Sequence, residues 1–417
     1  MTNRLARADR IAADIDALAA LTDPDRPWTR RAFTPRFLDG RAYVEKAMRD
    51  AGLTVRIDSA GNMIGRRPGR VPGKGVLAVG SHSDTVPDGG RFDGIAGVVA
   101  GLELARVLSE RGIELDHDLE VIDCLAEEVS IFGVSCIGSR AIAGVLPEDW
   151  LGRSVDGLTL EAGINDVGGD PARLIEAERT DIAAFLELHI EQGPVLEADQ
   201  LDVGIVTAIA GITRVEIIVT GRADHAGTTP MTARADALVA AADLVTVIDR
   251  LALERSRGNA HFAATVGEFS IFPGAANVVP SSARMLIDAR AERRADMDAF
   301  LTDLTRVVAE VAIRRAVAIA EPRLVSDNQP TPSDPALVAL LETAANAAGA
   351  THRRMASGAG HDMAFFVRIA PAAMLFVPCR NGRSHSPDEW AEPSAIALGT
   401  DVLIETIRRL DARQDTE

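Results

Sequence analysis

A histidine and two aspartates stand close together near residue 90 of this 417-residue chain, in a segment rich in glycine. His82 comes just after a wholly apolar stretch, residues 75–80, and Asp84 follows two residues later. Asp93 precedes a stretch with the apolar spacing of a helix. These side chains could bind a divalent cation, with Asp84 accepting the second imidazole N–H. An aspartate at a helix start and a lone histidine also have ordinary structural explanations, so this segment alone leaves the role open.

Three later segments also place histidine or glutamate after an apolar stretch. Glu127 and Glu128 follow one such stretch, His189 ends another, and His385 comes after a third. Ligands in open α/β sheets bind where the strands deliver their carboxyl ends, so we expect these side chains to converge. One glutamate could bind a cation while its neighbour acts as general base, although a solvated strand end would also explain the pair. The donor set suits borderline divalent cations, zinc first and manganese, cobalt or nickel next.

The elements that would position these residues form an α/β pattern. Apolar strands at 75–80 and 119–126 flank a helical stretch at 95–111, which is the strand-helix-strand order of a sheet with crossover helices. Further helices are predicted at 4–21, 39–51 and 334–348, and a buried strand is predicted at 373–377.

A different pattern runs from about residue 209 to 325. Strands are predicted there at 214–221, 261–269 and 284–290, and helices at 232–253 and 295–314. We therefore predict an α+β domain, 209–325, in which two helices cover one sheet face. It is inserted into a catalytic, metal-binding domain made of 1–208 and 326–417.

The composition of the chain indicates which classes of partner and which cellular compartment to expect. The chain has 61 acidic and 44 basic residues and a net charge of −17, which argues against nucleic-acid or anionic-membrane partners. The N-terminus has no uninterrupted apolar segment, and no window has about 18 apolar residues, so neither a signal peptide nor a membrane span is expected. The three widely spaced cysteines (Cys124, Cys136 and Cys379) predict no disulfide framework, and we expect a cytoplasmic protein.

Taken together, the motifs resemble the hydantoinase/carbamoylase family of dinuclear metal amidohydrolases, which includes N-carbamoyl-L-amino-acid hydrolases, allantoate amidohydrolases and a bacterial type of β-ureidopropionase. Besides the segments already described, the resemblance rests on His225-Ala-Gly-Thr-Thr-Pro-Met231, Ser357-Gly-Ala-Gly-His-Asp362 and Ser384-His-Ser386. His189 stands where the wider superfamily usually has an acidic ligand, which favours the carbamoylase branch.

This resemblance implies a zinc-aminopeptidase-like catalytic domain with a mixed, mostly parallel sheet, and an inserted α+β dimerisation (lid) domain. It implies two divalent metal ions, with zinc as the first expectation. The implied roles are His82 and His189 on one metal, Glu128 and His385 on the other, Asp93 bridging both, and Glu127 as general base.

The resemblance also implies substrate contacts and a homodimer. His225 would stabilise the oxyanion, in its own subunit or across the dimer interface. Asn277 and Arg290 would bind substrate, with further contacts from Gln192, from the backbone at Gly358 and, as a second anion contact, from Arg214. An arginine at a strand end offers a bidentate fork for a carboxylate, although a surface ion pair would explain Arg290 equally well.

The predicted activity is hydrolysis of a carbamoyl or ureido C–N bond in a small carboxylate-bearing substrate: an N-carbamoyl-L-amino acid, N-carbamoyl-β-alanine or allantoate. The alternatives are hydrolysis of an N-acyl-amino-acid or peptide amide by the same metal pair, and a catalytically silent binding module. Two departures from the family pattern bear on the substrate. Val129-Ser130-Ile131-Phe132 replaces Gly-Ser-Arg-Phe and leaves no arginine at that point of the sequence, and Met363 stands where alanine is usual.

Overall fold

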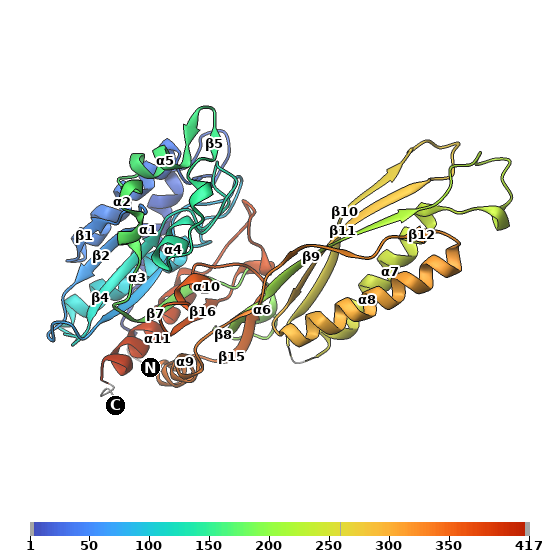
Figure 1. The fold of residues 1–417 in the computed structure, drawn as a ribbon. Coiled ribbons are helices and arrows are strands. Elements are labelled where there is room, and N and C mark those ends of the chain that lie inside the picture. Colours follow the sequence, from blue (N-terminus) through green and yellow to red (C-terminus); the bar gives the residue numbers. More distant parts are fainter. Residues whose placement is uncertain (1–3, 259, 413–417) are drawn as a thin grey trace. The chain divides into compact units, whose positions relative to one another are not determined.

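The computed structural model describes residues 4–258 and 260–412, which form two compact units (Figure 1). The first unit comprises the chain up to Thr207, Pro332–Arg354, and the chain from Gly360 onward. The second unit comprises Ala208–Thr331 and Met355–Ala359.

The second unit therefore differs in its limits from the predicted inserted domain, 209–325. Strand β13 (Arg323–Asp327) pairs with β9 (Gly211–Thr220), so the chain stays with the second unit beyond residue 325. Residues 355–359 join it as well, and the backbone N–H of Ala210 donates to the carbonyl of Ser357 at 2.8 Å. Backbone pairing between distant segments, which has no local sequence signal, sets these limits.

A nine-stranded mixed sheet forms the centre of the first unit, in the order β1-β2-β4-β3-β7-β16-β8-β14, with β15 paired to β8. Strands β4, β3, β7 and β16 are mutually parallel, whereas β1, β2 and β8 pair antiparallel. This confirms the predicted α/β class and the mostly parallel core of the sheet. The strands are β1 (Thr54–Ile57), β2 (Met63–Arg67), β3 (Val76–His82), β4 (Asp118–Cys124), β7 (Ile182–Ile190), β8 (Val203–Ile209), β14 (Thr331–Pro332), β15 (His352–Ser357) and β16 (Ala372–Val377).

Helices lie on both faces of this sheet. One face is covered by α1 (Ala8–Ala20), α2 (Pro35–Asp50), α3 (Ile95–Glu110), α9 (Pro335–Ala348) and α11 (Pro393–Asp411). Successive residues of β7 point to opposite faces. Leu186 and Leu188 join this large apolar core, whereas the ring of Phe185 stacks on Phe366 of the short helix α10 (Met363–Phe366).

The remaining elements of the first unit are short. They are α4 (Ile137–Ile142), α5 (Leu160–Asp166), α6 (Val195–Ala198), the hairpin β5 (Ser154–Val155) and β6 (Leu158–Thr159), and the 3₁₀ turns Glu148–Trp150, Pro171–Ala177 and Arg380–Gly382. Among the described residues, no helix is long and apolar enough to cross a membrane.

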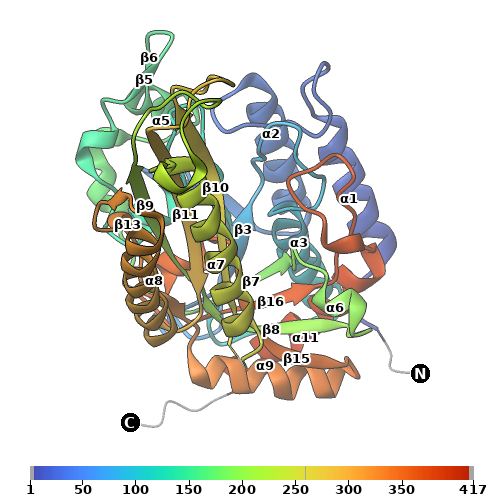
Figure 2. The same cartoon turned by 90° about the vertical axis from the view of Figure 1, so that its right-hand side faces the viewer.

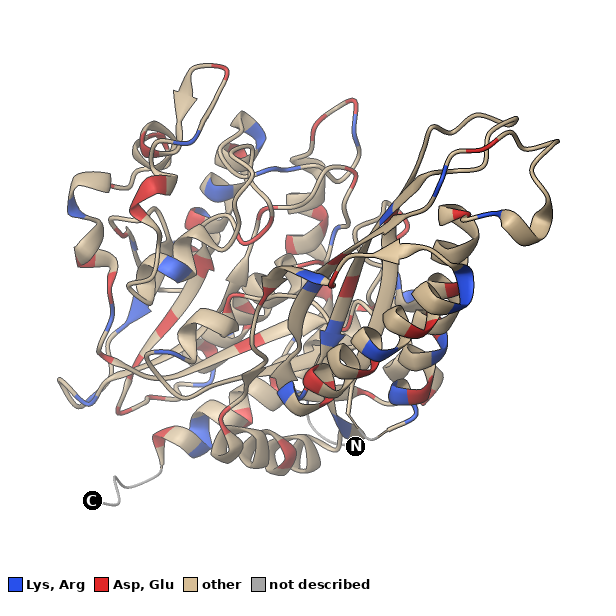
Figure 3. Ribbon diagram, turned by 45° about the vertical axis from the view of Figure 1, so that its right-hand side comes forward, with Lys and Arg blue, Asp and Glu red and all other residues tan. Residues whose placement is uncertain are grey.

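A five-stranded antiparallel sheet forms the second unit, with β10 (Phe262–Phe272), β11 (Ser282–Ala291), β9 and β12 (Ala318–Ile319) in that order and β13 paired to β9 (Figure 2). Helices α7 (Ala237–Ser256) and α8 (Arg294–Arg315) pack on the face that carries Val215, Ile217 and Val219. Acidic and basic residues are interspersed along these two helices (Figure 3).

Helix α7 begins five residues later than the predicted helix at 232–253. The side chain of Asp236 accepts the backbone N–H groups of Leu238 and Val239, at 3.0 and 3.2 Å, and so caps the helix there. The preceding residues Met231–Ala233 form a 3₁₀ turn. The apolar spacing alone does not mark this start, because it continues across the turn.

Candidate metal centre and substrate site

Four parallel strands bring the candidate ligands of the first unit to one edge of the sheet. His82 is the last residue of β3 and pairs in register with Cys124, the last residue of β4, three positions before Glu127. His189 lies near the end of β7, opposite Phe376 of β16. Parallel strands have their carboxyl ends at the same edge, so residues far apart in sequence meet there.

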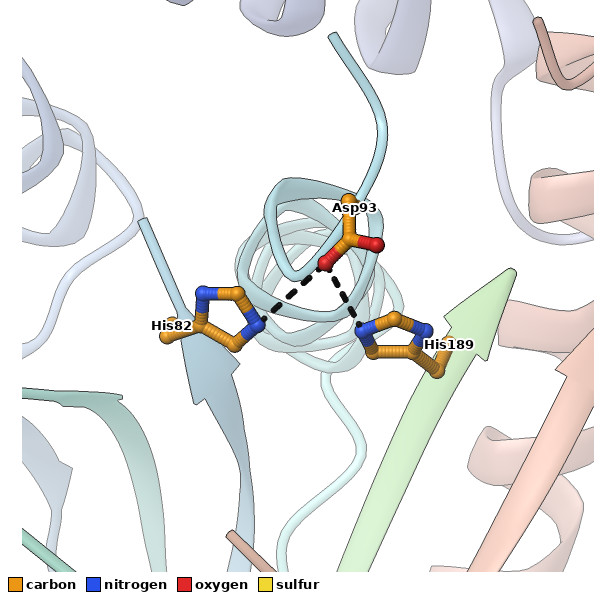
Figure 4. A group of neighbouring side chains, drawn as sticks. All are labelled: His82, Asp93 and His189. Atoms are coloured by element: carbon orange, nitrogen blue, oxygen red, sulfur yellow. Dashed lines mark ion pairs between the residues drawn. The ribbon is translucent and has the colours of Figure 1, made fainter. Parts of the chain in front are cut away.

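The first cluster comprises His82, Asp93 and His189, one donor atom of each lying within 4.8 Å of the others (Figure 4). The Nε2 atoms of His82 and His189 lie 3.6 and 3.4 Å from Asp93 Oδ1. All three side chains are buried. Gly94 adopts a φ of +66°, and a Cβ at this position would overlap the His82 ring, so glycine is required beside the cluster.

Backbone carbonyls orient both imidazole rings. The Nδ1 atom of His82 lies 3.1 Å from the carbonyl oxygen of Asp84, and that of His189 lies 2.9 Å from the carbonyl of Ile190. A carbonyl only accepts, so each Nδ1 carries the hydrogen and each Nε2 faces Asp93. The Nε2 atom of His82 is buried with no hydrogen-bond partner. The backbone N–H of Gly94 donates to the Nε2 atom of His189 at 3.1 Å.

Asp84 orients His82 mainly through its backbone rather than through its carboxylate. The carboxylate lies 3.5 Å from His82 Nδ1 and accepts the backbone N–H groups of Glu127 and Glu128, at 3.3 and 3.2 Å. The Asp84 carbonyl is thus the nearer acceptor for the imidazole N–H, at 3.1 Å against 3.5 Å for the carboxylate. The side chain of Asp84 also holds the backbone of the glutamate pair.

The second cluster comprises Asp93, Glu128 and His385. His385 Nε2 lies 3.0 Å from Glu128 Oε1 and 3.5 Å from Asp93 Oδ2. Asp93 thus uses one carboxylate oxygen in each cluster. The first cluster is closed to solvent, whereas the side chain of His385 is 48% exposed, so the second cluster is open on one side.

Glu127 stands beside the first cluster without belonging to either cluster. Its Oε2 lies 3.6 Å from His82 Nε2, and its Oε1 lies 3.6 Å from the thiol of Cys136. Burial raises the pKa of Glu127 well above its usual value, and the neighbouring His82 opposes that shift only in part. Adjacent residues in the sequence, Glu127 and Glu128, therefore have different surroundings.

Within the described residues, the carboxylates of the clusters form ion pairs only with histidines. Among residues 4–258 and 260–412, no lysine or arginine forms an ion pair with Asp93, Glu127 or Glu128. Burial alone would lower the pKa of His82, but carboxylates around the ring, Glu127 foremost, raise it well above its usual value. Hydrogen bonds to Asp93 and Glu128 raise the pKa of His385 to about 10. Buried carboxylates around imidazole nitrogens favour positive charge, which fits divalent cations.

Gln192 contacts Asp93 directly. Its Nε2 donates to Asp93 Oδ2 at 2.6 Å and lies 3.3 Å from the hydroxyl of Ser384, which lies 2.7 Å from the same carboxylate oxygen. The Oε1 atom of Gln192 is buried with no hydrogen-bond partner. The amide thus positions Asp93 with one end and keeps a free acceptor at the other.

In the second unit, Arg214, Arg290 and Gly358 lie together. Both arginines donate to Asp288, from Arg290 Nε at 2.8 Å and from Arg214 Nε at 3.2 Å, and Arg290 Nη1 donates to the carbonyl of Gly358 at 2.6 Å. The ion pair considered as an alternative for Arg290 is therefore present. Asp288 is shared by two guanidinium groups, however, so Arg214, Arg290 and Asp288 together carry one net positive charge.

His225 and Asn277 lie at the other end of the same sheet. Both are exposed, and their loops pair through the backbone, the N–H of Ala226 donating to the carbonyl of Asn277 at 2.9 Å. Asn277 precedes β11 at its Ser282 end, whereas Arg290 is near the opposite end. At a rise of about 3.3 Å per residue, strand β11 separates the two groups by roughly 25 Å.

The two departures from the family pattern have different surroundings. Val129 is exposed, and Arg31 donates through Nη2 to the carbonyls of Val129 and Ser130, at 3.3 and 2.9 Å. A guanidinium therefore does reach this segment, from about a hundred residues earlier. Met363 is completely buried at the start of α10, so its side chain fills the core.

Glu187 is a buried carboxyl group near the clusters that the sequence analysis did not single out. It accepts the hydroxyl of Ser81 at 2.8 Å and the backbone N–H of Met363 at 3.1 Å. Burial raises its pKa, and the neighbouring His189 opposes the shift. The available signal was a charged residue inside the apolar strand that ends in His189, since such a residue needs buried partners.

Comparisons with known proteins agree with this arrangement. A family model described as Peptidase family M20/M25/M40 matches residues 78–409. The N-carbamoyl-L-amino-acid amidohydrolase of Paenarthrobacter aurescens is 40% identical over 415 residues, covering 99% of this chain and 100% of that protein. The ureidoglycolate hydrolase of Oryza sativa subsp. japonica is 35% identical over 414 residues, covering 97% and 84%.

Among solved structures, a hydantoinase/carbamoylase family amidase from Burkholderia multivorans superimposes with a TM-score of 0.90 at 35% identity, covering 98% of each chain. The resemblance and the fold class predicted from the motifs are thereby confirmed.

Proposed function

Because the chain belongs to Peptidase family M20/M25/M40, we propose that it is a metal-dependent amidohydrolase that cleaves a carbamoyl or ureido C–N bond of a small carboxylate-bearing substrate. The observation that carries this proposal is the pair of three-residue clusters that share Asp93. Relatives named N-carbamoyl-L-amino-acid amidohydrolase and ureidoglycolate hydrolase support the bond type.

The clusters would hold two divalent cations, His82 and His189 binding one, Glu128 and His385 the other, and Asp93 both. The unpartnered Nε2 of His82 and the convergence of carboxylates with histidines alone support this assignment. Nitrogen and oxygen donors in these numbers favour zinc, with manganese, cobalt and nickel as further candidates. Such cations would supply Lewis-acid polarisation of the scissile carbonyl and ease deprotonation of the attacking water.

Glu127 is the proposed general base. Its carboxylate would take the proton from the water that attacks the carbamoyl carbon and return it to the leaving nitrogen when the C–N bond breaks. Asp84 would position Glu127 through the backbone N–H that it accepts. Removal of a carbamoyl group in this way releases the amine, carbon dioxide and ammonia.

The proposed side-chain contacts to substrate include two arginines and a glutamine. Arg290 is the proposed partner of the substrate carboxylate, with Arg214 contributing charge, because these two guanidinium groups share only one aspartate. Gln192 would accept from a substrate N–H through its free Oε1. The backbone at Gly358 and the side chain of Asn277 are the remaining proposed contacts, and His225 is the proposed donor to the oxyanion.

We also propose a homodimer in which the second unit serves for dimerisation and substrate binding. Strand β10 is an edge strand with three large exposed apolar side chains, Phe269, Ile271 and Phe272. His225 and Arg290 of one chain are roughly 25 Å apart along β11, so one small substrate cannot contact both from the same copy. His225 would therefore act on the substrate of the other subunit.

The cytoplasm is the proposed location, since Cys124, Cys136 and Cys379 are all buried and free of disulfide bonds. The alternative activity, hydrolysis of an N-acyl-amino-acid or peptide amide, would use the same residues. A catalytically silent binding module is less consistent with the retention of Glu127 beside the first cluster.

A substrate panel tests the proposal. Protein reconstituted with Zn²⁺ or Mn²⁺ would be incubated with N-carbamoyl-L-amino acids, N-carbamoyl-β-alanine, allantoate, ureidoglycolate and N-acetyl-L-amino acids, and ammonia and free amine would be measured. We expect ammonia from at least one carbamoyl or ureido compound. Amine release from the N-acetyl compounds alone would favour the alternative activity.

A further inference from the structure

The loop that delivers Asp93 is held by a buried glutamate near the C-terminal end of the chain. Glu389 is only 2% exposed, and its Oε1 accepts the backbone N–H groups of Phe92 and Asp93, at 2.8 and 3.0 Å. Its Oε2 lies 2.9 Å from the hydroxyl of Ser384, the same hydroxyl that lies 2.7 Å from Asp93 Oδ2. One carboxyl group thus contacts both the backbone and, through Ser384, the side chain of Asp93.

No cation within the protein accounts for the burial of this carboxyl group. Within the described parts of the chain, Glu389 forms no ion pair with lysine or arginine, and its partners are the two N–H groups and the Ser384 hydroxyl. Burial of a carboxyl group without a cation is costly, so a glutamate here needs a compensating role.

The loop is shaped to admit this carboxyl group. A Cβ at Gly90 would overlap the carboxylate of Glu389, so only glycine leaves room for it. The next residue of the C-terminal segment, Trp390, packs edge-on against Phe92 with ring centroids 5.2 Å apart, and the guanidinium of Arg91 lies 4.6 Å from the Trp390 ring. Aromatic packing thus supports the loop beside the hydrogen bonds.

We infer that Glu389 is a positioning residue that fixes the Asp93 carboxylate between the two candidate metal clusters. This role rests on the proposed function, because it matters only if Asp93 binds both cations. Asp93 offers one oxygen to each cluster, so a rotation of its carboxylate would weaken both sites together.

The hydrogen-bond pattern predicts which replacement preserves this role. Ser384 has one hydroxyl hydrogen and two carboxyl neighbours, so it can donate to only one of them at a time. In Glu389→Gln the amide oxygen can still accept both backbone N–H groups, and the amide nitrogen can donate to Ser384, whose own hydrogen then serves Asp93. In Glu389→Ala all three contacts are lost.

The test is the affinity for Zn²⁺ of the metal-free protein, measured by competition with a chromogenic chelator, with folding checked by circular dichroism and thermal melting. We expect Glu389→Ala to bind Zn²⁺ about 10- to 100-fold more weakly than the wild type, the range for loss of a group that orients a metal ligand. The Zn²⁺ affinity of Glu389→Gln should remain within about 3-fold of the wild-type value, because the amide keeps the hydrogen bonds. Asp388→Asn, an exposed neighbour, is the matched control and should bind as the wild type does.

A second variant keeps the test decisive if Glu389→Ala does not fold. Gly90→Ala removes no polar group, but its methyl group would displace the Glu389 carboxylate, and we expect it to weaken Zn²⁺ binding as well. Wild-type affinity in folded Glu389→Ala or Gly90→Ala would overturn the inference, as would equal losses in Glu389→Gln and Glu389→Ala. Wild-type protein that binds no divalent cation would instead contradict the proposed function and this role with it.

Discussion

The polar side chains of the two units differ in what surrounds them. Those of the first unit, such as His82, Asp93 and His189, are buried, lie within hydrogen-bond or ion-pair distance of one another, and are held by backbone groups. Those of the second unit, such as His225 and Arg290, are exposed or half-exposed and lie at opposite ends of one sheet.

This difference separates two kinds of site. Buried carboxylates without lysine or arginine partners are costly unless a cation joins them, so the geometry of the first unit by itself points to metal binding. Exposed arginines and histidines are stable without a ligand, so their roles depend on what they meet in the assembled protein. The predictions below test this contrast in order of expected effect.

Removal of the metal should have the largest effect and should act through the first unit. We expect exhaustive chelation to abolish ammonia release, and Zn²⁺, Mn²⁺, Co²⁺ or Ni²⁺ to restore it, because the clusters supply donors for such cations. A cation at 100 times its Kd should also stabilise the fold by about 2.7 kcal/mol, visible as a rise in Tm. Full turnover by rigorously metal-free protein would refute the metal assignment.

Glu127→Gln should come next, with a loss of about 100- to 10,000-fold in kcat and little change in metal content. The amide is nearly isosteric but cannot take a proton from water. Glu128→Gln is the matched comparison, and we expect it to lower metal content, measured by atomic emission. If the two variants exchanged these phenotypes, the roles of the neighbouring glutamates would be reversed.

His225→Ala should reduce kcat by about 100- to 1,000-fold, the usual effect of losing one oxyanion donor. Mixing it with Glu127→Gln under conditions of subunit exchange sharpens the contrast between the units. If His225 acts on the other subunit, a hybrid dimer contains one site with an intact Glu127 and an intact His225, and activity should reappear.

Each variant alone, incubated in the same way, serves as the control for this mixture. No recovery despite demonstrated exchange of subunits would exclude action across the interface. A monomer at micromolar concentration, measured by sedimentation, would exclude the dimer itself.

Arg290→Ala should have the smallest effect of the four. Loss of a hydrogen bond to a charged group costs about 1.5–3 kcal/mol, which corresponds to a decrease of roughly 10- to 150-fold in kcat/KM. We expect this decrease only for substrates that carry a carboxylate. The neutral amide analogue should lose far less. Arg293→Ala, an exposed arginine paired with Asp296, is the matched control. Equal losses on the acid and the amide would return Arg290 to a structural role.

Much of the metal site could be predicted before the structure because its signals are local. An apolar stretch predicts a buried strand, and the polar residue after it predicts what reaches the sheet edge, as with His82 after residues 75–80. Parallel strand order then implies convergence without knowledge of individual contacts. Helix starts were less predictable, because the cap at Asp236, rather than the apolar spacing, sets where α7 begins.

The contacts that orient these residues could be found only in the folded chain. Asp84 holds the glutamate pair through their backbone N–H groups, Arg31 reaches the carbonyl of Val129, and Glu389 holds the loop of Asp93 from almost three hundred residues away. The spacing of apolar residues predicts which segments are buried, and this spacing can be read from residues that are neighbours in the sequence. Which polar group supplies the hydrogen bonds at a buried position depends on segments that come together only in the folded chain. No pattern within one segment predicts that contact.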